Sequence, residues 1–363
     1  MLMSELSLTG NVGEWSEVYV LLKLLAEGKL YSAKDNLRPD EELYFPLLKV
    51  MRKESGNKDV EFSINRESEY VYVTIDGNKK DEVPFSRFSE KAERLYEVIE
   101  AKRTTTFSVP DIEYFLVDLG CESIKAASNK KADITVQIHD PQTGYEPVCG
   151  FSIKSQLGNP STLLNAGKTT NFAFRVEGLS QDEIERINSI EGKQKIISRI
   201  NAIYEQASEV TFEKVTNETF ARNLMLVDSR MPEIIAEALL VYYRDGRRRL
   251  KDIVDLLEKR NPLEFPSPGF YLYKVKKFLC AVALGLKPAS IWDGNDEANG
   301  GYIIVTASGD VVAYSIYNRN NFEDYLLANT CLEKASTSRH EFASLYKADD
   351  AVYVNLNLQI RFV

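Results

Sequence analysis

Residues 132–158 constrain the fold of this chain more than any other stretch. Two short runs of alternating apolar residues flank a turn rich in proline and glycine, a pattern that predicts a β-hairpin. Asp133 opens the first predicted strand, and Lys154 lies in the second. Because side chains alternate along a strand, Ser152, Lys154 and Gln156 share one face of the hairpin.

An aspartate and a lysine on neighbouring strands form the skeleton of a metal-dependent phosphodiesterase site. Asp133 would bind a hard divalent cation through its carboxylate oxygens. Lys154 would orient or help to deprotonate the attacking water, or offset the charge that builds on the phosphate. The same spacing also fits a purely structural hairpin with one polar and one apolar face, so the spacing alone leaves both interpretations open.

The size and composition of the chain indicate a globular protein. Its 363 residues, 44% of them hydrophobic, suffice for two domains or one large elaborated domain. We find no N-terminal apolar signal segment and no run of about 18 apolar residues, so we expect no membrane span. The four cysteines are spread singly. This spacing argues against a zinc site or a disulfide framework and favours a reducing, cytoplasmic location.

The net charge of −9 argues, as an average, against a nucleic-acid partner. A sequence-specific enzyme nevertheless needs only a local basic surface. Basic residues cluster at 244–251 (RDGRRRLK) and 274–277 (KVKK). Each cluster also fits a solvated helix face.

The hydrophobic patterns predict two parts. Residues 1–260 form the first part, with a helix at 14–27, a β-rich insertion at 30–85, a core at 88–215 that contains Asp133 and Lys154, and further helices up to 260. Three prolines and a glycine in residues 261–269 mark the boundary. Residues 261–363 then form a C-terminal α+β part.

Further elements are predicted from local patterns. Residues 169–175 alternate and predict a third core strand, and residues 181–206 predict one long helix. A strong hairpin signal joins 301–305 to 311–317, and residues 351–363 predict a single final strand.

Glu14 and Glu17 lie three residues apart near the start of the first predicted helix, on one face. They could simply complement the helix dipole. Alternatively, Glu17 points from this helix to the metal site.

The chain resembles the HpaII family of type II restriction endonucleases. The likeness is carried by GEWSEVYVLLKLL (13–25), KADITVQI (131–138), GFSIKSQLGNPSTLLNA (150–166), TNFAFRV (170–176), GGYIIV (300–305), IYNRNNFEDYLLANT (316–330) and STSRHEF (336–342). The resemblance implies an α+β fold with a PD-(D/E)xK core, a mixed sheet flanked by helices. It makes residues 1–260 the nuclease part, with the first core helix at 14–27 and the catalytic core at 88–215, and gives residues 261–363 possible DNA-recognition elements. It also implies Mg²⁺-dependent cleavage of double-stranded DNA at a short GC-rich palindrome, CCGG in the type member.

The superfamily pattern is an aspartate, followed by an acid two residues before a lysine on the next strand. Asp133 and Lys154 match its ends, but Ser152 stands where the second acid should be. Either Asp133 suffices as metal ligand, together with the phosphate and a backbone carbonyl, or another acid reaches the site. Glu17 is our choice, since related nucleases often supply a carboxylate from the first core helix. Weaker candidates are Glu14, Glu113 and Asp118.

Gln156, on the face of Lys154, could hold a water or the phosphate, or be a solvated strand residue. Arg339 is the preferred reader of guanine, whose O6 and N7 match an arginine in the major groove. Each candidate for DNA contact also fits a phosphate contact or plain surface. The candidates are Lys131, Asn318, Arg319, Ser338, Arg339 and His340.

The resemblance therefore predicts a type II restriction endonuclease that leaves 5′-phosphate ends. A cognate DNA cytosine methyltransferase would be its genetic partner. The alternative is a sequence-specific DNA-binding protein with a degenerate nuclease core, which Ser152 would support. A palindromic target fits a homodimer, and it also fits a monomer that nicks each strand in turn.

Overall fold

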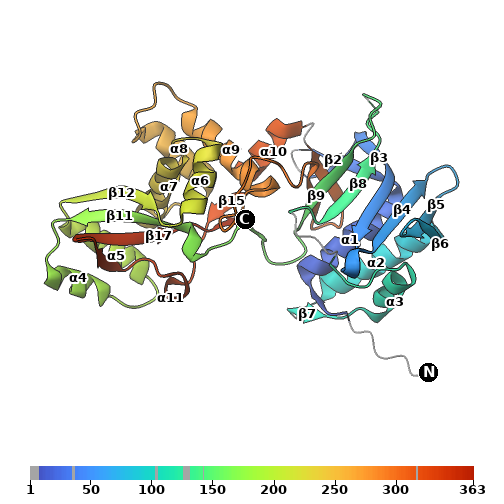
Figure 1. The fold of residues 1–363 in the computed structure, drawn as a ribbon, viewed down its shortest axis with the longest axis horizontal. Helices are drawn as coiled ribbons and strands as arrows, with labels where there is room; N and C mark the ends of the chain where they lie inside the picture. The colour runs from blue at the N-terminus through green and yellow to red at the C-terminus, as the bar shows by residue number, and fades with distance from the viewer. Residues whose placement is uncertain (1–7, 35–36, 103–104, 126–130, 142, 316–317) are drawn as a thin grey trace. The chain divides into compact units, whose positions relative to one another are not determined.

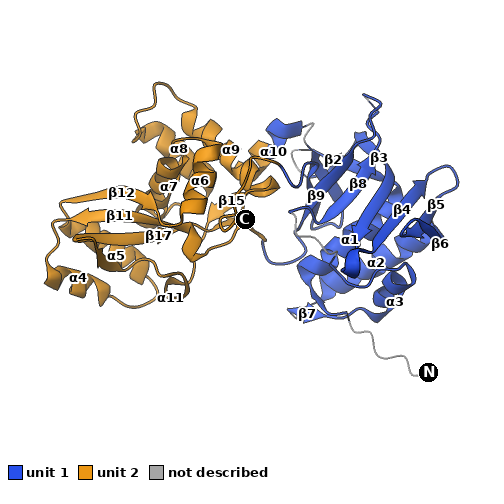
Figure 2. Cartoon of the chain, viewed as in Figure 1, with its two compact units in different colours: residues 1–160, 296–322 blue, residues 161–295, 323–363 orange. Residues whose placement is uncertain are grey.

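The computed structural model describes residues 8–34, 37–102, 105–125, 131–141, 143–315 and 318–363. The chain divides into two compact units (Figure 2). Unit 1 comprises residues 1–160 and 296–322, and unit 2 comprises residues 161–295 and 323–363. Each unit is thus assembled from two separate parts of the chain.

The central feature of unit 1 is a sheet of nine strands from its described residues, in the order β2-β14-β13-β9-β8-β3-β4-β5-β6. Its strands are β2 (Lys29–Ala33), β3 (Pro39–Lys53), β4 (Asp59–Asn65), β5 (Tyr70–Ile75), β6 (Asn78–Pro84), β8 (Ile134–Ile138), β9 (Val148–Ser155), β13 (Gly301–Val305) and β14 (Val311–Ser315). The β9–β13 and β14–β2 pairs are parallel. Because β2 also pairs with β3, the strands from β2 to β3 form a hydrogen-bonded circuit.

The helices of unit 1 lie together beside this sheet (Figure 1). They are α1 (Val12–Glu27), α2 (Phe85–Ala101) and α3 (Pro110–Asp118). Asn11 and Glu14 form a capping box at the start of α1, and Gly28 ends the helix with φ +62°. The predicted first core helix is confirmed, with its start two residues earlier. Immediately before α1, β1 (Gly10–Asn11) forms a short antiparallel pair with β7 (Thr106–Phe107).

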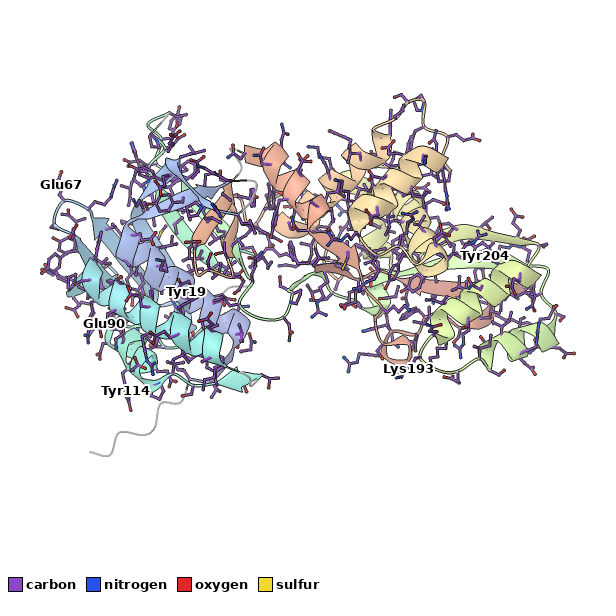
Figure 3. The ribbon with its side chains drawn as sticks, turned by 180° about the vertical axis from the view of Figure 1, so that it is seen from behind. Tyr19, Glu67, Glu90, Tyr114, Lys193 and Tyr204 are labelled. Atoms are coloured by element: carbon purple, nitrogen blue, oxygen red, sulfur yellow. The ribbon has the colours of Figure 1, made fainter. Side chains whose placement is uncertain are left out.

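Helix α1 is buried along most of its length because it packs between α2 and the strands β2, β3, β9 and β14. Tyr19 fixes it to the turn after β13. Its hydroxyl donates a hydrogen bond to the carbonyl of Gly309 at 2.6 Å (Tyr19 is labelled in Figure 3). The ring of Tyr96 on α2 lies 5.8 Å from the Tyr19 ring, and its hydroxyl donates to the Ala307 carbonyl at 3.0 Å.

Two expected boundaries differ from this arrangement. The β-rich stretch 30–85 does not form a separate insertion, because β3 pairs directly with β8 and extends the same sheet. The predicted boundary at 260/261 also differs, because the hairpin β13–β14 lies beside β9 in unit 1. Pairing between strands so distant in sequence leaves no local signal, which explains both differences.

Unit 2 contains two sheets among its described residues. One has the order β12-β11-β17-β16 and the other the order β10-β18-β15. The strands are β10 (Thr162–Leu164), β11 (Asn171–Glu177), β12 (Glu209–Val215), β15 (Thr330–Leu332), β16 (Leu345–Ala348), β17 (Ala351–Asn357) and β18 (Ile360–Phe362). The stretch 169–175, expected as a third core strand, falls mainly in β11 and therefore lies outside the sheet of Lys154.

Helices pack around these two sheets. They are α4 (Gln181–Asn188), α5 (Lys195–Gln206), α6 (Glu218–Val227), α7 (Met231–Asp245), α8 (Leu250–Arg260), α9 (Phe270–Leu284) and α11 (Thr337–His340), while α10 (Arg319–Ala328) runs from unit 1 into unit 2. The long helix expected at 181–206 is two helices, and Gly192 between them has φ +112°. The expected final strand is likewise divided into β17 and β18. None of the helices in the described ranges is both long and apolar enough to span a membrane.

Two glycines let β13 approach its neighbours closely. A Cβ on Gly300 would lie 2.6 Å from the Phe151 ring, and a Cβ on Gly301 would lie 2.1 Å from the Tyr314 carbonyl oxygen. Gly301 also has φ +105°, a conformation that other residues rarely adopt. The glycine pair thus permits the position of β13 against β9 and β14.

We expect Gly301→Ala to destabilise unit 1 by about 2–5 kcal/mol, since it adds backbone strain to a collision with the main chain of β14. Gly77→Ala is the matched control, because Gly77 also has a positive φ but its Cβ would meet no atom within 4 Å. Urea unfolding of both variants checks this expectation. Equal losses of stability would contradict it.

Candidate active site

Asp133 is fixed to the strand that carries Lys154. It lies one residue before β8, and its N–H donates to the Phe151 carbonyl at 2.8 Å. Its Oδ2 accepts hydrogen bonds from the Ile153 N–H at 2.8 Å and the Ser152 hydroxyl at 3.0 Å. The predicted hairpin is confirmed as the antiparallel pair β8–β9, and it brings Asp133, Ser152 and Lys154 together.

Ser152 links the two ends of the predicted pattern. Its side chain is buried, and its hydroxyl accepts a hydrogen bond from Lys154 Nζ at 3.1 Å while donating to Asp133. A serine can make both contacts because a hydroxyl is donor and acceptor at once. The ammonium of Lys154 is therefore held beside the carboxylate of Asp133 through one side chain.

Glu17 faces this cluster from α1. Burial, and then the charge of Asp133, raise the pKa of Glu17 from 4.5 to about 7, whereas Lys125 and Lys154 lower it. Helix α1 is held on β9 at this level, because the Ser16 hydroxyl hydrogen-bonds to the Ser155 hydroxyl at 2.8 Å. The charge of Asp133 thus disfavours the charged form of Glu17, an arrangement that a bound cation would relieve.

Burial lowers the pKa of Lys154, and the charges of Asp133 and Glu17 oppose that effect. Lys125 lowers it further. The ammonium of Lys154 also lies over the ring of Tyr302, 5.3 Å from the ring centroid. Burial of a charged lysine is costly unless its charge is compensated, and here Asp133, Glu17 and the Tyr302 ring compensate it.

A divalent metal fits these donors. The hydrogen bonds that Asp133 accepts from described residues both end on Oδ2, which leaves Oδ1 for a cation. Glu17 would supply the second carboxylate, and Mg²⁺ needs only one or two carboxylates besides water and phosphate. Within the described ranges, no group of three or more His, Cys, Asp or Glu side chains could hold a metal ion.

Lys125 is a basic residue that the sequence did not suggest, and its charge lowers the pKa values of Glu17 and Lys154. It is exposed, and it follows a segment anchored by the buried pair of Arg52 and Glu54. Arg52 donates to the Ile124 carbonyl at 3.0 Å, and Glu54 accepts from the Ser123 hydroxyl at 3.1 Å. The effect of Lys125 on the pKa values of Glu17 and Lys154 could not be predicted from the sequence, because it depends on how distant segments fold together.

Gln156 lies just beyond β9 and is exposed. Its Oε1 accepts a hydrogen bond from the Ala307 N–H at 3.2 Å, in the turn between β13 and β14. The side chain therefore contacts that turn. The weaker candidate Glu113 is buried, with Oε1 accepting from the Ser108 hydroxyl and the Val109 N–H.

The candidates for DNA contact divide between the units. In unit 1, the Lys131 N–H donates to Glu297 at 2.7 Å, and the Asn318 amide donates to the Ser32 hydroxyl at 3.1 Å. Arg319 begins α10, is exposed, and its charge lowers the pKa of Asp296, which burial raises.

In unit 2, residues 337–340 form the short helix α11, which is capped by Ser336. Ser338 and Arg339 are exposed on it. The carbonyl of His340 accepts a hydrogen bond from the Asn171 amide at 2.8 Å, which fixes the end of α11 to β11.

We expect Glu17→Gln to raise the free energy of unfolding of the metal-free protein by roughly 1–3 kcal/mol near pH 8.5. The pKa of Glu17 is about 7 in the folded protein against 4.5 ordinarily, so the folded state binds the proton more tightly. The stability that this proton contributes is present at low pH and is lost as the pH rises to about 7.

At about pH 5 the variant should gain little, because the folded wild-type carboxyl is already protonated there. Urea titrations at the two pH values test this difference. The same gain at both values would show that the pKa of Glu17 is not raised.

Comparisons with known proteins identify the family of this chain. The family model for HpaII restriction endonuclease matches residues 11–362. The type II restriction enzyme HpaII of Haemophilus parainfluenzae is 42% identical over 359 residues, which cover 98% of this chain and 99% of that protein. A search of solved structures gives no significant match. Because both matches run through nearly the whole length, the chain belongs to the HpaII restriction endonuclease family.

Proposed function

We propose that this type II restriction endonuclease hydrolyses double-stranded DNA at the palindrome CCGG with Mg²⁺ as cofactor and leaves 5′-phosphate ends. The observation that carries the chemistry is the hydrogen-bonded series Asp133–Ser152–Lys154, faced by Glu17. The target sequence rests on family membership alone.

Asp133 and Glu17 would hold the metal ion through carboxylate oxygens. When bound, Mg²⁺ supplies a Lewis acid that polarises the phosphate and lowers the pKa of a bound water. Lys154 donates hydrogen bonds from its ammonium to the attacking water or the phosphate and offsets the developing negative charge. The attacking water releases a proton to solvent as its oxygen bonds to phosphorus, the P–O3′ bond breaks, and the 3′ oxygen takes up a proton from solvent.

Ser152 takes the position of the second acid of the PD-(D/E)xK pattern. We infer that its hydroxyl fixes Asp133 and Lys154 relative to each other, and that Glu17 supplies the carboxylate that Ser152 lacks. A carboxylate at position 152 would add negative charge beside Asp133 and raise the pKa values of both acids. A hydroxyl avoids that cost.

We also propose that the sheet of unit 1 is a PD-(D/E)xK core. Three features support this assignment: the antiparallel pair β8–β9 that carries the site, the parallel strand β13 beside β9, and helix α1 packed on the sheet. The elements β4–β6 extend the sheet beyond the catalytic hairpin.

The partners follow from this function. A cytosine methyltransferase that modifies CCGG would protect the DNA of the host cell. Two copies of the chain related by two-fold symmetry would match a palindrome. The cytoplasm, where the DNA lies, is the proposed location, and the four cysteines are all free and buried, as a reducing compartment allows.

The direct test is digestion of a plasmid of known sequence with purified protein and Mg²⁺, followed by sequencing of the fragment ends. Defined ends within CCGG are expected. Sequence-specific binding in EDTA without cleavage in any divalent metal would instead favour a DNA-binding protein with a degenerate nuclease core.

We expect Asp133→Asn to lower the cleavage rate by about a thousandfold or more, since it removes a charged metal ligand. Binding of the CCGG duplex in EDTA should remain. Asp81→Asn on the exposed edge strand β6 is the control and should cleave at the wild-type rate. Cleavage by Asp133→Asn at the rate of the control would exclude this assignment.

Arg339→Ala should reduce cleavage of CCGG by roughly 5- to 150-fold and relax discrimination against a changed guanine, if Arg339 makes a bidentate contact. Cleavage of CCGG and of single-base variants over a range of salt concentrations measures both effects. A uniform loss on all sequences, with the salt slope reduced by about one, would make Arg339 a phosphate contact. Lys347→Ala, exposed on β16, controls for loss of charge in unit 2.

A further inference from the structure

Strand β13 places an aromatic ring beside the catalytic lysine. In the parallel pair β9–β13, Tyr302 is opposite Ser152 and Ile304 is opposite Lys154. Residues in register on neighbouring strands project from the same face of a sheet, so Tyr302 shares the face of Ser152 and Lys154. The Lys154 side chain extends toward them, with Nζ 3.1 Å from the Ser152 hydroxyl and 5.3 Å from the centre of the Tyr302 ring.

The position of the Tyr302 ring is strongly constrained. Its side chain is fully buried, and its ring meets that of Phe322 edge-on, with centroids 5.1 Å apart and planes inclined by 63°. Gly300 and Gly301 before it allow no side chain larger than hydrogen without collision. Burial and the contact with Phe322 therefore hold the ring in place beside Lys154.

We propose that Tyr302 is a positioning residue for Lys154, which it holds through the face of its ring for the reaction proposed above. The negative face of an aromatic ring attracts an ammonium within about 6 Å. Ser152 accepts one hydrogen bond from Nζ, and the ring contributes attraction without taking up a further N–H donor in a conventional hydrogen bond. The remaining donors stay available for water or phosphate.

A carboxylate in the place of the ring would bind the ammonium more strongly, but it would also bind metal and raise the local negative charge. An aliphatic side chain would leave the buried ammonium less compensated, and burial already lowers the pKa of Lys154. The aromatic ring stabilises the cation while keeping the number of carboxylates unchanged.

The first test compares Tyr302→Phe with Tyr302→Leu in single-turnover cleavage of a CCGG duplex. Tyr302→Phe keeps the aromatic face and should retain a rate within about threefold of wild type, whereas Tyr302→Leu should lose roughly 3- to 30-fold. Duplex binding in EDTA should be the same for both variants, so the loss falls on kcat rather than on KM. Equal rates for both variants would overturn the proposal.

The second test changes the ring electronically and keeps its shape. Phenylalanine and its mono-, di- and trifluorinated forms are incorporated at position 302, and each fluorine weakens the attraction of the ring for a cation. The cleavage rate should fall stepwise along the series while the melting temperature stays nearly constant. A flat series would show that Tyr302 acts only by filling space.

The same series at Phe62, buried in β4 of the same sheet, is the matched control and should give a constant rate. The results distinguish a failure of the Tyr302 proposal from a failure of the nuclease assignment. If wild type does not cleave or Asp133→Asn cleaves normally, the nuclease assignment fails. If those results are as expected and the fluorinated series is flat, only the role of Tyr302 fails.

Discussion

The hydrogen bonds from β9 to the Asp133 carboxylate are the interaction on which the site depends. Asp133 lies just outside β8, and it is fixed because the Ile153 N–H and the Ser152 hydroxyl both bind its Oδ2. This contact orients the other oxygen of the carboxylate and places Lys154 beside it through Ser152. The rest of unit 1 supplies groups around this pair: Glu17 from α1 and Tyr302 from β13.

The charged residues of the cluster come from separate elements and compensate one another's charges. Burial disfavours the charged forms of both Glu17 and Lys154, and each charge is partly compensated by the other. Partly buried charges of this kind contribute little to the stability of the fold, but such a site is suited to bind a cation and a phosphate. The Arg52–Glu54 pair shows the contrasting case, a buried pair that anchors the segment before Lys125.

Local patterns predicted the elements of the site. The hairpin β8–β9, the helix α1 and the hairpin β13–β14 each follow from apolar periodicity and turn residues within a short window. The proximity of Asp133 and Lys154 follows from that hairpin, and the structure brings Ser152 and Glu17 to the same place. The functional roles of these residues stay predictions.

Long-range pairing could not be predicted. The sequence gives no sign that β13 lies beside β9, since residues 161–295 of unit 2 separate them along the chain. For the same reason Tyr302 was not identified, although its segment was noted as part of the family resemblance. Lys125 has no motif of its own, and β3–β6 could not be recognised as part of the catalytic sheet because only pairing with β8 reveals it.

The most direct test of the central claim is a crystal structure of the protein soaked with Mn²⁺, with the anomalous signal used to locate the metal. We predict a peak bound by carboxylate oxygens of both Asp133 and Glu17, with Lys154 retained on Ser152. The account would be contradicted by a peak bound to Asp133 with Glu17 turned away, or by a metal bound elsewhere in unit 1. Either result would show that Glu17 does not supply the carboxylate that the pattern places at position 152.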